Sequence, residues 1–118
     1  MKRIFTIFLT LFVASSVWAY DFEVDGIYYD IINENEVAVT IGDYFFDREN
    51  DTYSGNVVIP SSVTYSGKNY SVTSIGKDAF YDCSGLTSVT IPNSVTEIGY
   101  EAFYYCSGLT SVLVTRLV

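Results

Sequence analysis

Apolar and polar positions in the second half of the chain recur at a fixed interval. Residues 75–89 read IGKDAFYDCSGLTSV and residues 98–112 read IGYEAFYYCSGLTSV, with twelve of the fifteen positions identical and a constant offset of 23 residues. A fixed period of this length is typical of a solenoid, in which each repeat forms one coil and buries its apolar side against the next. The pattern therefore predicts a fold with an extended surface, which is better suited to binding a partner than to catalysis.

The apolar spacing within one repeat predicts a short strand. Leu86, Val89 and Ile91 follow the L-x-x-V-x-I spacing of the strand segment in a leucine-rich repeat. Pro92 cannot donate a hydrogen bond to a strand ladder, so it ends the strand. We expect the strands of successive repeats to stack in parallel at a spacing of roughly 4.8 Å.

A second element is predicted between the strands. Ala102, Phe103 and Cys106 recur at a helix-like spacing (i, i+1, i+4), which predicts one short helical turn. Ser107 and Gly108 then break this turn before the next strand opens. The fold class expected from these patterns is a leucine-rich-repeat-like solenoid of short parallel strands and short helical turns.

An earlier, imperfect copy of the strand precedes the two close repeats. Residues 57–64 match residues 89–96 at six of eight positions, but the offset is 32 residues. The nine additional residues include Tyr65-Ser66-Gly67-Lys68-Asn69-Tyr70, which we expect to form a hairpin tip that projects from the first coil.

The segment before the repeats has a different pattern. Over residues 22–41 apolar and β-branched positions form short strands, with Asp25-Gly26 as a two-residue hairpin turn. Residues 42–56 are loop-like, with Tyr44, Phe45 and Phe46 as expected anchors. We therefore predict two parts, an antiparallel β-rich cap over residues 20–56 and a repeat array over residues 57–118.

The first nineteen residues are typical of a secretory signal peptide. Lys2 and Arg3 form a positive start, an apolar run follows, and Val17-Trp18-Ala19 resembles an A-x-A cleavage site. The alternative is a membrane anchor, although the apolar run is shorter than the roughly 20 residues that span a bilayer. Cleavage after Ala19 predicts a secreted or cell-surface protein without a stable membrane span.

The charge of the mature chain limits its partners. Residues 20–118 hold fourteen acidic side chains against four basic ones, a net charge of −10, and ten of the acids lie in residues 20–52. Such a surface repels nucleic acid and anionic lipid. We therefore expect a protein or cell-surface partner and no nucleic acid.

These residues resemble a known family. The stretch IPNSVTEIGYEAFYYCSGLTSV is similar to the 23-residue repeat of BspA-like leucine-rich repeat proteins, which are secreted and surface proteins of Bacteroidetes, and the match covers residues 57–112. The opening DFEVDGIYY also resembles the N-terminal region of such proteins. The resemblance implies a solenoid fold, adhesion to proteins or cells, and no catalytic residues.

The repeat pattern stops within the third coil. Thr115 stands where the repeat has Pro, and residues 113–118 do not return to I-P-x-S-V. About two and a half repeats are therefore present, fewer than the three or more that usually give stability. This pattern favours either a fragment of a longer repeat protein or a short form that needs a partner to cover its open end.

Two groups of residues are candidates for binding. Exposed tyrosines suit protein interfaces and could also stack on sugars, whereas hydroxyl side chains that alternate with buried strand positions line the outer face of the sheet. The function predicted first is protein or cell adhesion through these surfaces. The alternatives are carbohydrate binding through the tyrosines, or a nonfunctional fragment of a longer repeat protein. The tyrosine candidates are Tyr65, Tyr70, Tyr81, Tyr104 and Tyr105, and the sheet candidates are Thr87, Ser88, Thr90, Thr110 and Ser111.

Catalytic and cofactor signals are absent from the sequence. It contains no histidine, no nucleophile elbow and no phosphate-binding loop, so we predict no enzyme activity and no cofactor. Cys83 and Cys106 occupy one repeat position and are interpreted as buried thiols, with a disulfide between stacked coils as the alternative. A cluster of acids could hold calcium, but a solvated loop is the simpler interpretation; these acids are Asp43, Asp47, Glu49 and Asp51.

Overall fold

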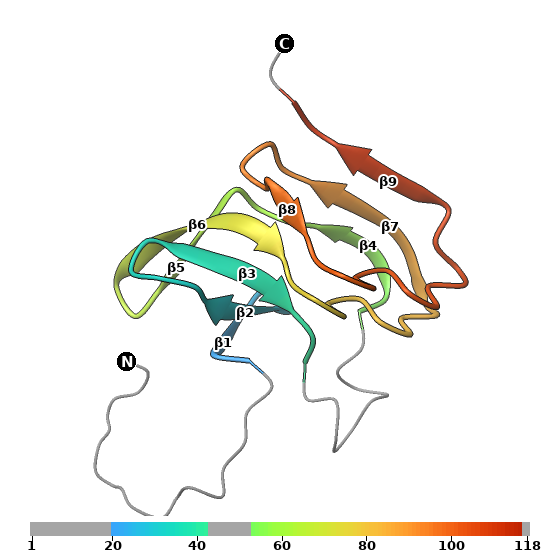
Figure 1. Ribbon diagram of the computed structural model, residues 1–118, viewed down its shortest axis with the longest axis horizontal. Helices are drawn as coiled ribbons and strands as arrows, with labels where there is room; N and C mark the ends of the chain where they lie inside the picture. Colours follow the sequence, from blue (N-terminus) through green and yellow to red (C-terminus); the bar gives the residue numbers. More distant parts are fainter. Residues whose placement is uncertain (1–19, 43–52, 117–118) are drawn as a thin grey trace, which may run out of the picture.

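The computed structural model describes residues 20–42 and 53–116, which form nine strands in two sheets (Figure 1). A three-stranded sheet has the order β4-β7-β9, and a six-stranded sheet has the order β1-β2-β3-β6-β5, with β8 paired to β6. The strands are β1 (Phe22–Val24), β2 (Ile27–Ile31), β3 (Glu36–Thr40), β4 (Gly55–Val58), β5 (Ser62–Tyr65), β6 (Lys68–Ile75), β7 (Leu86–Ile91), β8 (Glu97–Ile98) and β9 (Ser111–Val114).

The two close repeats stack in register, as the 23-residue period predicts. In one layer β9 pairs in parallel with β7, and Val112 lies beside Val89. In the opposite layer β8 pairs in parallel with β6, and Ile98 lies beside Ile75. Each repeat therefore contributes one strand to each layer, which is the arrangement of a solenoid.

The N-terminal strands begin as a hairpin and then join the solenoid. β1 and β2 are antiparallel and connected by Asp25 and Gly26, both at positive φ (53° and 83°), as the Asp-Gly pair predicts. β3 is antiparallel to β2 but parallel to β6. This segment therefore provides the first rung of the layer that β6 and β8 continue.

The nine-residue insertion forms a second hairpin. β5 and β6 are antiparallel, and Ser66 and Gly67 connect them at φ values of 54° and 78°. Both turn residues lie in the left-handed region, as in the type I′ turns that suit two-residue hairpins. The expected hairpin tip is thus present in the structure.

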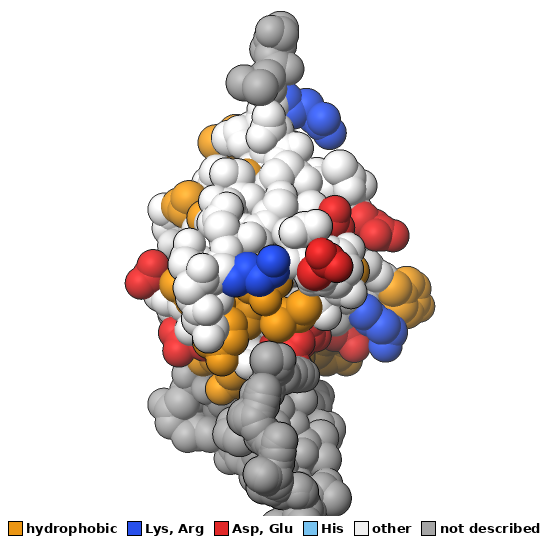
Figure 2. All heavy atoms as spheres, turned by 90° about the vertical axis from the view of Figure 1, so that its left-hand side faces the viewer, with side chains coloured by type: hydrophobic (Ala, Val, Ile, Leu, Met, Phe, Trp, Pro, Cys, Tyr) orange, Lys and Arg blue, Asp and Glu red, His pale blue; other side chains and the backbone are white. Residues whose placement is uncertain are grey.

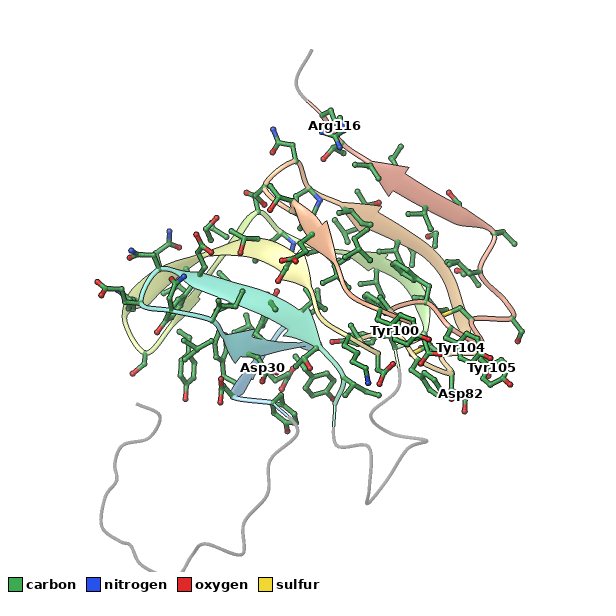
Figure 3. The ribbon with its side chains drawn as sticks, in the orientation of Figure 1. Asp30, Asp82, Tyr100, Tyr104, Tyr105 and Arg116 are labelled. Atoms are coloured by element: carbon green, nitrogen blue, oxygen red, sulfur yellow. The ribbon has the colours of Figure 1, made fainter. Side chains whose placement is uncertain are left out.

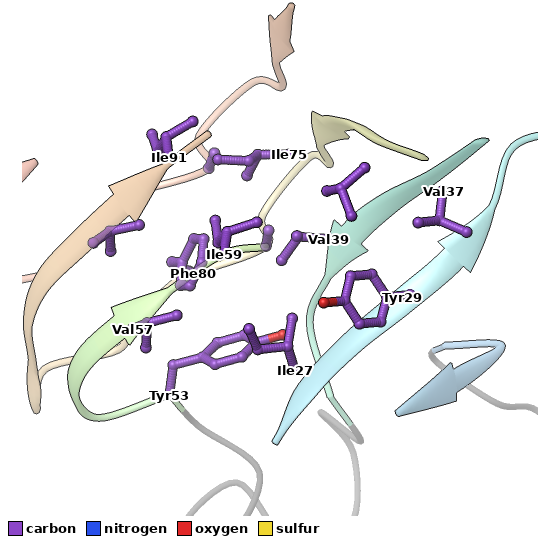
Figure 4. Packing of buried hydrophobic residues seen from close by; sticks show 14 of the residues in the cluster. Ile27, Tyr29, Val37, Val39, Tyr53, Val57, Ile59, Ile75, Phe80 and Ile91 are labelled. Atoms are coloured by element: carbon purple, nitrogen blue, oxygen red, sulfur yellow. The ribbon is translucent and has the colours of Figure 1, made fainter. Parts of the chain in front are cut away.

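The core lies between the two layers (Figure 4). Leu86, Val89 and Ile91 are all buried, as the L-x-x-V-x-I spacing predicts. Phe80 belongs to the same buried cluster, and the rings of Tyr53 and Phe103 flank its ring at centroid distances of 4.7 and 5.1 Å. The core thus extends across the repeat boundaries, as expected of a solenoid in which each coil completes its neighbour.

Two buried tyrosines tie the N-terminal strands to this core. The hydroxyl of Tyr53 donates to the carbonyl oxygen of Thr40 (2.7 Å) and accepts from the backbone N–H of Tyr28 (2.9 Å). Burial raises the pKa of Tyr53, and burial followed by the charge of Asp25 raises the pKa of Tyr29 to about 12. Because the folded state favours the protonated phenols, their contribution to stability is complete below about pH 10, and the contribution of Tyr29 is lost as the pH rises through about 12.

The predicted short helical turn is wrong. No helix occurs in residues 20–42 or 53–116, and the segment between β6 and β7 is a series of tight turns. A helix would use every N–H internally, whereas here only alternate N–H groups bond locally, such as that of Ala79 to Gly76 (3.2 Å). The N–H groups between them cross to the next repeat, as Phe80 donates to the carbonyl of Ala102 (2.8 Å). The turns therefore form an inter-repeat ladder of their own.

The surface carries charges of both signs. On the face seen in Figure 2, acidic and basic side chains lie around hydrophobic ones without forming a large area of one charge. Among the described residues, no helix is long and apolar enough to cross a membrane.

Candidate binding surface

Three tyrosine rings contact one another where the turns of the two repeats stack, those of Tyr81, Tyr104 and Tyr105. Tyr100 lies at the start of the same turn segment of the second repeat (Figure 3), and we call these four residues the tyrosine edge. The ring centroids of Tyr104 and Tyr105 are 4.2 Å apart, and those of Tyr81 and Tyr104 are 5.5 Å apart. Tyr100 and Tyr105 expose 72% and 60% of their surface. The edge therefore offers several aromatic rings to solvent from adjacent turns.

The tyrosine edge arises from the differences between the repeats. Only three positions differ between residues 75–89 and 98–112, and two of them exchange a charged residue for tyrosine, Lys77 for Tyr100 and Asp82 for Tyr105. Tyr105 adopts a φ of 61°, equivalent to the 60° of Asp82. Asp tolerates the left-handed region far better than a bulky aromatic residue does. The second repeat thus holds Tyr105 in a strained backbone conformation, with its ring exposed to solvent.

The hydroxyl of Tyr104 stays protonated at neutral pH. A hydrogen bond with Tyr105 raises the pKa of Tyr104, and partial desolvation and the charge of Glu101 raise it further. A protonated phenol both donates and accepts hydrogen bonds. Tyr104 therefore combines apolar ring area with a neutral polar tip.

The structure places the tyrosine candidates in different surroundings. Tyr81 and Tyr104 belong to the tyrosine edge, but Tyr70 is only 8% exposed and packs in the core, because it lies on the inward side of β6. Tyr65 is half-buried and stacks on Phe22 at a centroid distance of 4.2 Å. The hairpin is present, but the expectation that Tyr65 and Tyr70 are exposed binding residues is corrected, because both side chains pack against the core.

Tyr100 was missed in the sequence. The equivalent position of the first repeat holds Lys77, so the repeat pattern gave no reason to expect an aromatic residue there. The signal that could have found it is the comparison of the two repeats, since their differing positions, rather than the shared ones, mark the variable surface.

The hydroxyl side chains of the predicted sheet face lie together on the outer side of the β4-β7-β9 sheet. Ser88 lies between Asn56 and Ser111, and its hydroxyl donates to the side-chain oxygen of Asn56. The next row is more apolar, because Thr90 lies between Val58 and Leu113.

The remaining two hydroxyl residues lie at the start of these strands and are tied to each other. The backbone N–H and the hydroxyl of Thr110 both donate to the carbonyl of Thr87, at 2.9 and 3.2 Å. The five sheet candidates are thus brought onto one face, although the exposed Val58 and Leu113 make that face less polar than expected.

Both cysteines are free thiols in the structure. Cys83 is buried, and the thiol of Cys106 donates to the carbonyl oxygen of Phe80 at 2.9 Å. Burial is the main cause that raises the pKa of Cys106, a backbone hydrogen bond from Cys83 opposes it, and Asp82 adds to it. A raised pKa reduces the thiolate fraction, which agrees with the interpretation of these residues as packed thiols.

Among the described residues no three potential metal-ligating side chains come together. The acidic loop that contains Asp43, Asp47, Glu49 and Asp51 lies outside the described residues, as do the expected anchors Tyr44, Phe45 and Phe46 and the expected signal peptide.

Solved structures of leucine-rich repeat proteins resemble this chain. One from Bacteroides ovatus is 38% identical, with a TM-score of 0.68, and the match covers 79% of this chain and 23% of that one. One from Bacteroides capillosus is 35% identical, with a TM-score of 0.66, and covers 80% of this chain and 64% of that one. A leucine rich cell surface protein from Faecalibacterium prausnitzii is 30% identical, with a TM-score of 0.65, and covers 87% of this chain and 25% of that one.

This chain therefore spans less than two thirds of the length of each of these relatives. No curated protein matches it. The family model described as "BspA type Leucine rich repeat region (6 copies)" matches residues 39–117, which is more than half of the chain. The strand register, the 23-residue period and this match agree, and the chain belongs to the BspA-type leucine-rich repeat family.

Proposed function

We propose that this chain is a noncatalytic protein-binding module of a secreted or cell-surface protein, and that the tyrosine edge is its main contact surface. The observation that carries this proposal is the exchange of Lys77 and Asp82 for Tyr100 and Tyr105 between otherwise near-identical repeats. A change that serves packing alone would bury the new rings, but both are exposed.

The chemistry of the edge suits a protein partner. Tyrosine is enriched among the residues that dominate the binding energy of interfaces, because it buries a large area and keeps a polar tip. The rings of Tyr81, Tyr104 and Tyr105 already contact one another, which reduces the entropy lost when a partner orders them. A relative described as a leucine rich cell surface protein supports the proposed location.

Carbohydrate binding is the second candidate function. A sugar ring stacks on an open aromatic face, and Tyr100 is the most exposed tyrosine of the edge. Tyr104 and Tyr105 suit this role less well, because with ring centroids 4.2 Å apart they partly cover each other. The two functions therefore predict that different ligands, peptides in one case and sugars in the other, bind to the tyrosine edge.

The test uses the double variant Tyr100→Lys/Tyr105→Asp of residues 20–118. It installs the residues that the first repeat carries at the same positions, so we expect it to fold, which circular dichroism checks. Peptides selected from a random displayed library on the native chain should lose at least tenfold in affinity for this variant, as expected when interface tyrosines are removed.

The control variant is Val58→Asp, which changes an exposed valine on β4 and leaves the tyrosine edge intact. Peptides that bind the double variant as well as the native chain would contradict the proposal. Saturable binding on a glycan array that the double variant loses would favour the carbohydrate function instead.

A further inference from the structure

Acidic residues border the tyrosine edge. The backbone N–H of Asp82 donates to the carbonyl oxygen of Tyr104 (2.8 Å), and Figure 3 shows the two residues close together. The backbone N–H of Asp78 likewise donates to the carbonyl oxygen of Tyr100 (3.2 Å). Glu101 lies in the same turn as Tyr104, whose N–H bonds to the carbonyl oxygen of Glu101 (3.2 Å). The tyrosine edge therefore lies among three acidic residues.

Basic residues are scarce in the turns that form this edge. Lys77 is the one lysine or arginine between β6 and β7 or between β8 and β9. Its ammonium nitrogen lies 3.4 Å from a carboxylate oxygen of Asp78, so it is already paired. At the equivalent positions the second repeat has Tyr100 and Glu101. The second repeat thus keeps the acid of this pair and lacks its cation.

The carboxylate of Glu101 is left without a charge partner. Among the described residues it forms no ion pair and accepts no hydrogen bond, and its side chain is half-buried. Its charge reaches the tyrosines, because it adds to the hydrogen bond with Tyr105 and to desolvation in raising the pKa of Tyr104. A half-buried carboxylate beside exposed aromatic rings favours a cation supplied from outside the chain.

The exposure of these positions does not depend on the open side of the second repeat. In the first repeat, which the second one covers, the side chains of Lys77 and Asp78 are still 68% and 35% exposed. Asp78 also takes its cation from the neighbouring residue of its own turn, and not from the repeat that stacks on it. We therefore expect Tyr100 and Glu101 to face solvent whether or not another coil follows.

We propose that the tyrosine edge binds an exposed arginine of its protein partner, with the guanidinium paired to Glu101 and stacked on the tyrosine rings. This inference rests on the proposed function and adds the chemistry of the partner. The planar guanidinium pairs with a carboxylate and also lies on an aromatic face, whereas the ammonium of lysine is more strongly hydrated. The acidic residues around the edge attract a positively charged segment and repel an acidic one.

The test is an NMR titration of residues 20–118, with labelled tyrosines, by the peptide acetyl-Gly-Arg-Gly-Arg-Gly-amide. A matched peptide carries citrulline in place of arginine, which keeps the shape of the side chain and removes its charge. We expect the arginine peptide to shift the ring signals of Tyr100, Tyr104 and Tyr105 and to bind about tenfold more tightly than the citrulline peptide, because its hydrogen bonds involve a charged group. Raising the salt concentration from about 50 mM to about 500 mM should weaken this binding.

A charge-removing variant tests the role of the carboxylate. Glu101→Gln keeps the size of the side chain and should weaken binding of the arginine peptide about threefold to tenfold, with no effect on the citrulline peptide. Glu34→Gln is the matched control, because it removes the same charge from an exposed residue between β2 and β3 and should leave binding unchanged. The double variant Tyr100→Lys/Tyr105→Asp keeps the net charge and should lose binding of the arginine peptide as well.

The outcomes separate this inference from the proposed function. No binding of the arginine peptide, equal binding of the arginine and citrulline peptides, or equal affinities of Glu101→Gln and Glu34→Gln would overturn the inference. If the tyrosine double variant still loses the peptides selected from the random library, the proposed function stands without an arginine in the partner. If that variant keeps those peptides, the proposed function itself is contradicted.

Discussion

The two repeats of this solenoid share most of their sequence, yet they differ sharply in how much of it they bury. Phe80, Leu86 and Val89 of the first repeat are buried, and their counterparts Phe103, Leu109 and Val112 are half-buried or exposed. The backbone register is the same in both. The difference comes from the neighbours, because the first repeat lies between two others and the second is covered on one side only within residues 20–42 and 53–116.

This comparison shows that the stability of a repeat depends on its position in the array. In a solenoid, each unit contributes an intrinsic term and an interface term for each neighbour. The second repeat lacks one interface term within the described residues. The same substitution made in both repeats should therefore change the free energy of unfolding by different amounts. The difference between the two values measures the missing interface term.

The largest expected difference in stability loss between the two repeats is at the stacked phenylalanines. Phe80→Ala removes a fully buried ring that packs between Tyr53 and Phe103, and it should lower the free energy of unfolding by about 3–5 kcal/mol. Phe103→Ala removes a ring that is covered on one side only, so we expect less than half of that loss. Urea denaturation of both variants measures the two values, and equal losses would contradict the positional account.

A pair of equivalent glycines should show the opposite order, with the larger loss of stability in the second repeat. A Cβ on Gly99 would lie 2.5 Å from the backbone nitrogen of Lys77, whereas a Cβ on Gly76 would lie 3.1 Å from the carbonyl oxygen of Val39. Gly99→Ala should therefore force the repeats apart and cost roughly 1–3 kcal/mol, and Gly76→Ala should cost less.

The control for the glycine pair is Gly85→Ala, whose Cβ would meet only the side chain of Ser54 at 3.4 Å. Thermal unfolding of the three variants gives the ranking. A Gly99→Ala protein as stable as Gly85→Ala would show that the close approach of the two turns is not a constraint.

The smallest difference concerns the two thiols. Cys83 is 1% exposed, so it should react with a thiol reagent only when the protein opens, whereas the half-buried Cys106 should react in the folded state. The rates of labelling in native buffer, followed by mass spectrometry, distinguish the two sites. Faster labelling of Cys83 would mean that the first repeat opens before the second.

Much of the fold could be predicted because its signals are local. The L-x-x-V-x-I spacing located β7, and the Asp-Gly pair located the first hairpin turn. The helical turn could not be recognised as wrong from spacing, because Ala102, Phe103 and Cys106 face inward in either conformation. Inter-repeat hydrogen bonds decide the conformation, and they depend on a neighbour that is distant in sequence.

The candidate surface was harder to predict than the fold. Tyrosine at a hairpin tip is an ambiguous signal, because Tyr70 lies on the inward side of β6 and Tyr65 reaches back to Phe22. The position of Tyr105 was visible in the sequence, but its strained backbone was not. The partner's identity depends on surface shape beyond the repeat pattern, and a solenoid sequence specifies its core much more strictly than its surface.

The most direct test of the central claim is native-state hydrogen exchange of β7 and β9. The account predicts that amides of Leu86–Ile91 exchange near the rate set by global unfolding, and that amides of Ser111–Val114 exchange much faster, because local opening needs few contacts to break. Equal protection of the two strands would contradict the claim that neighbours, and not sequence, set the difference between the repeats.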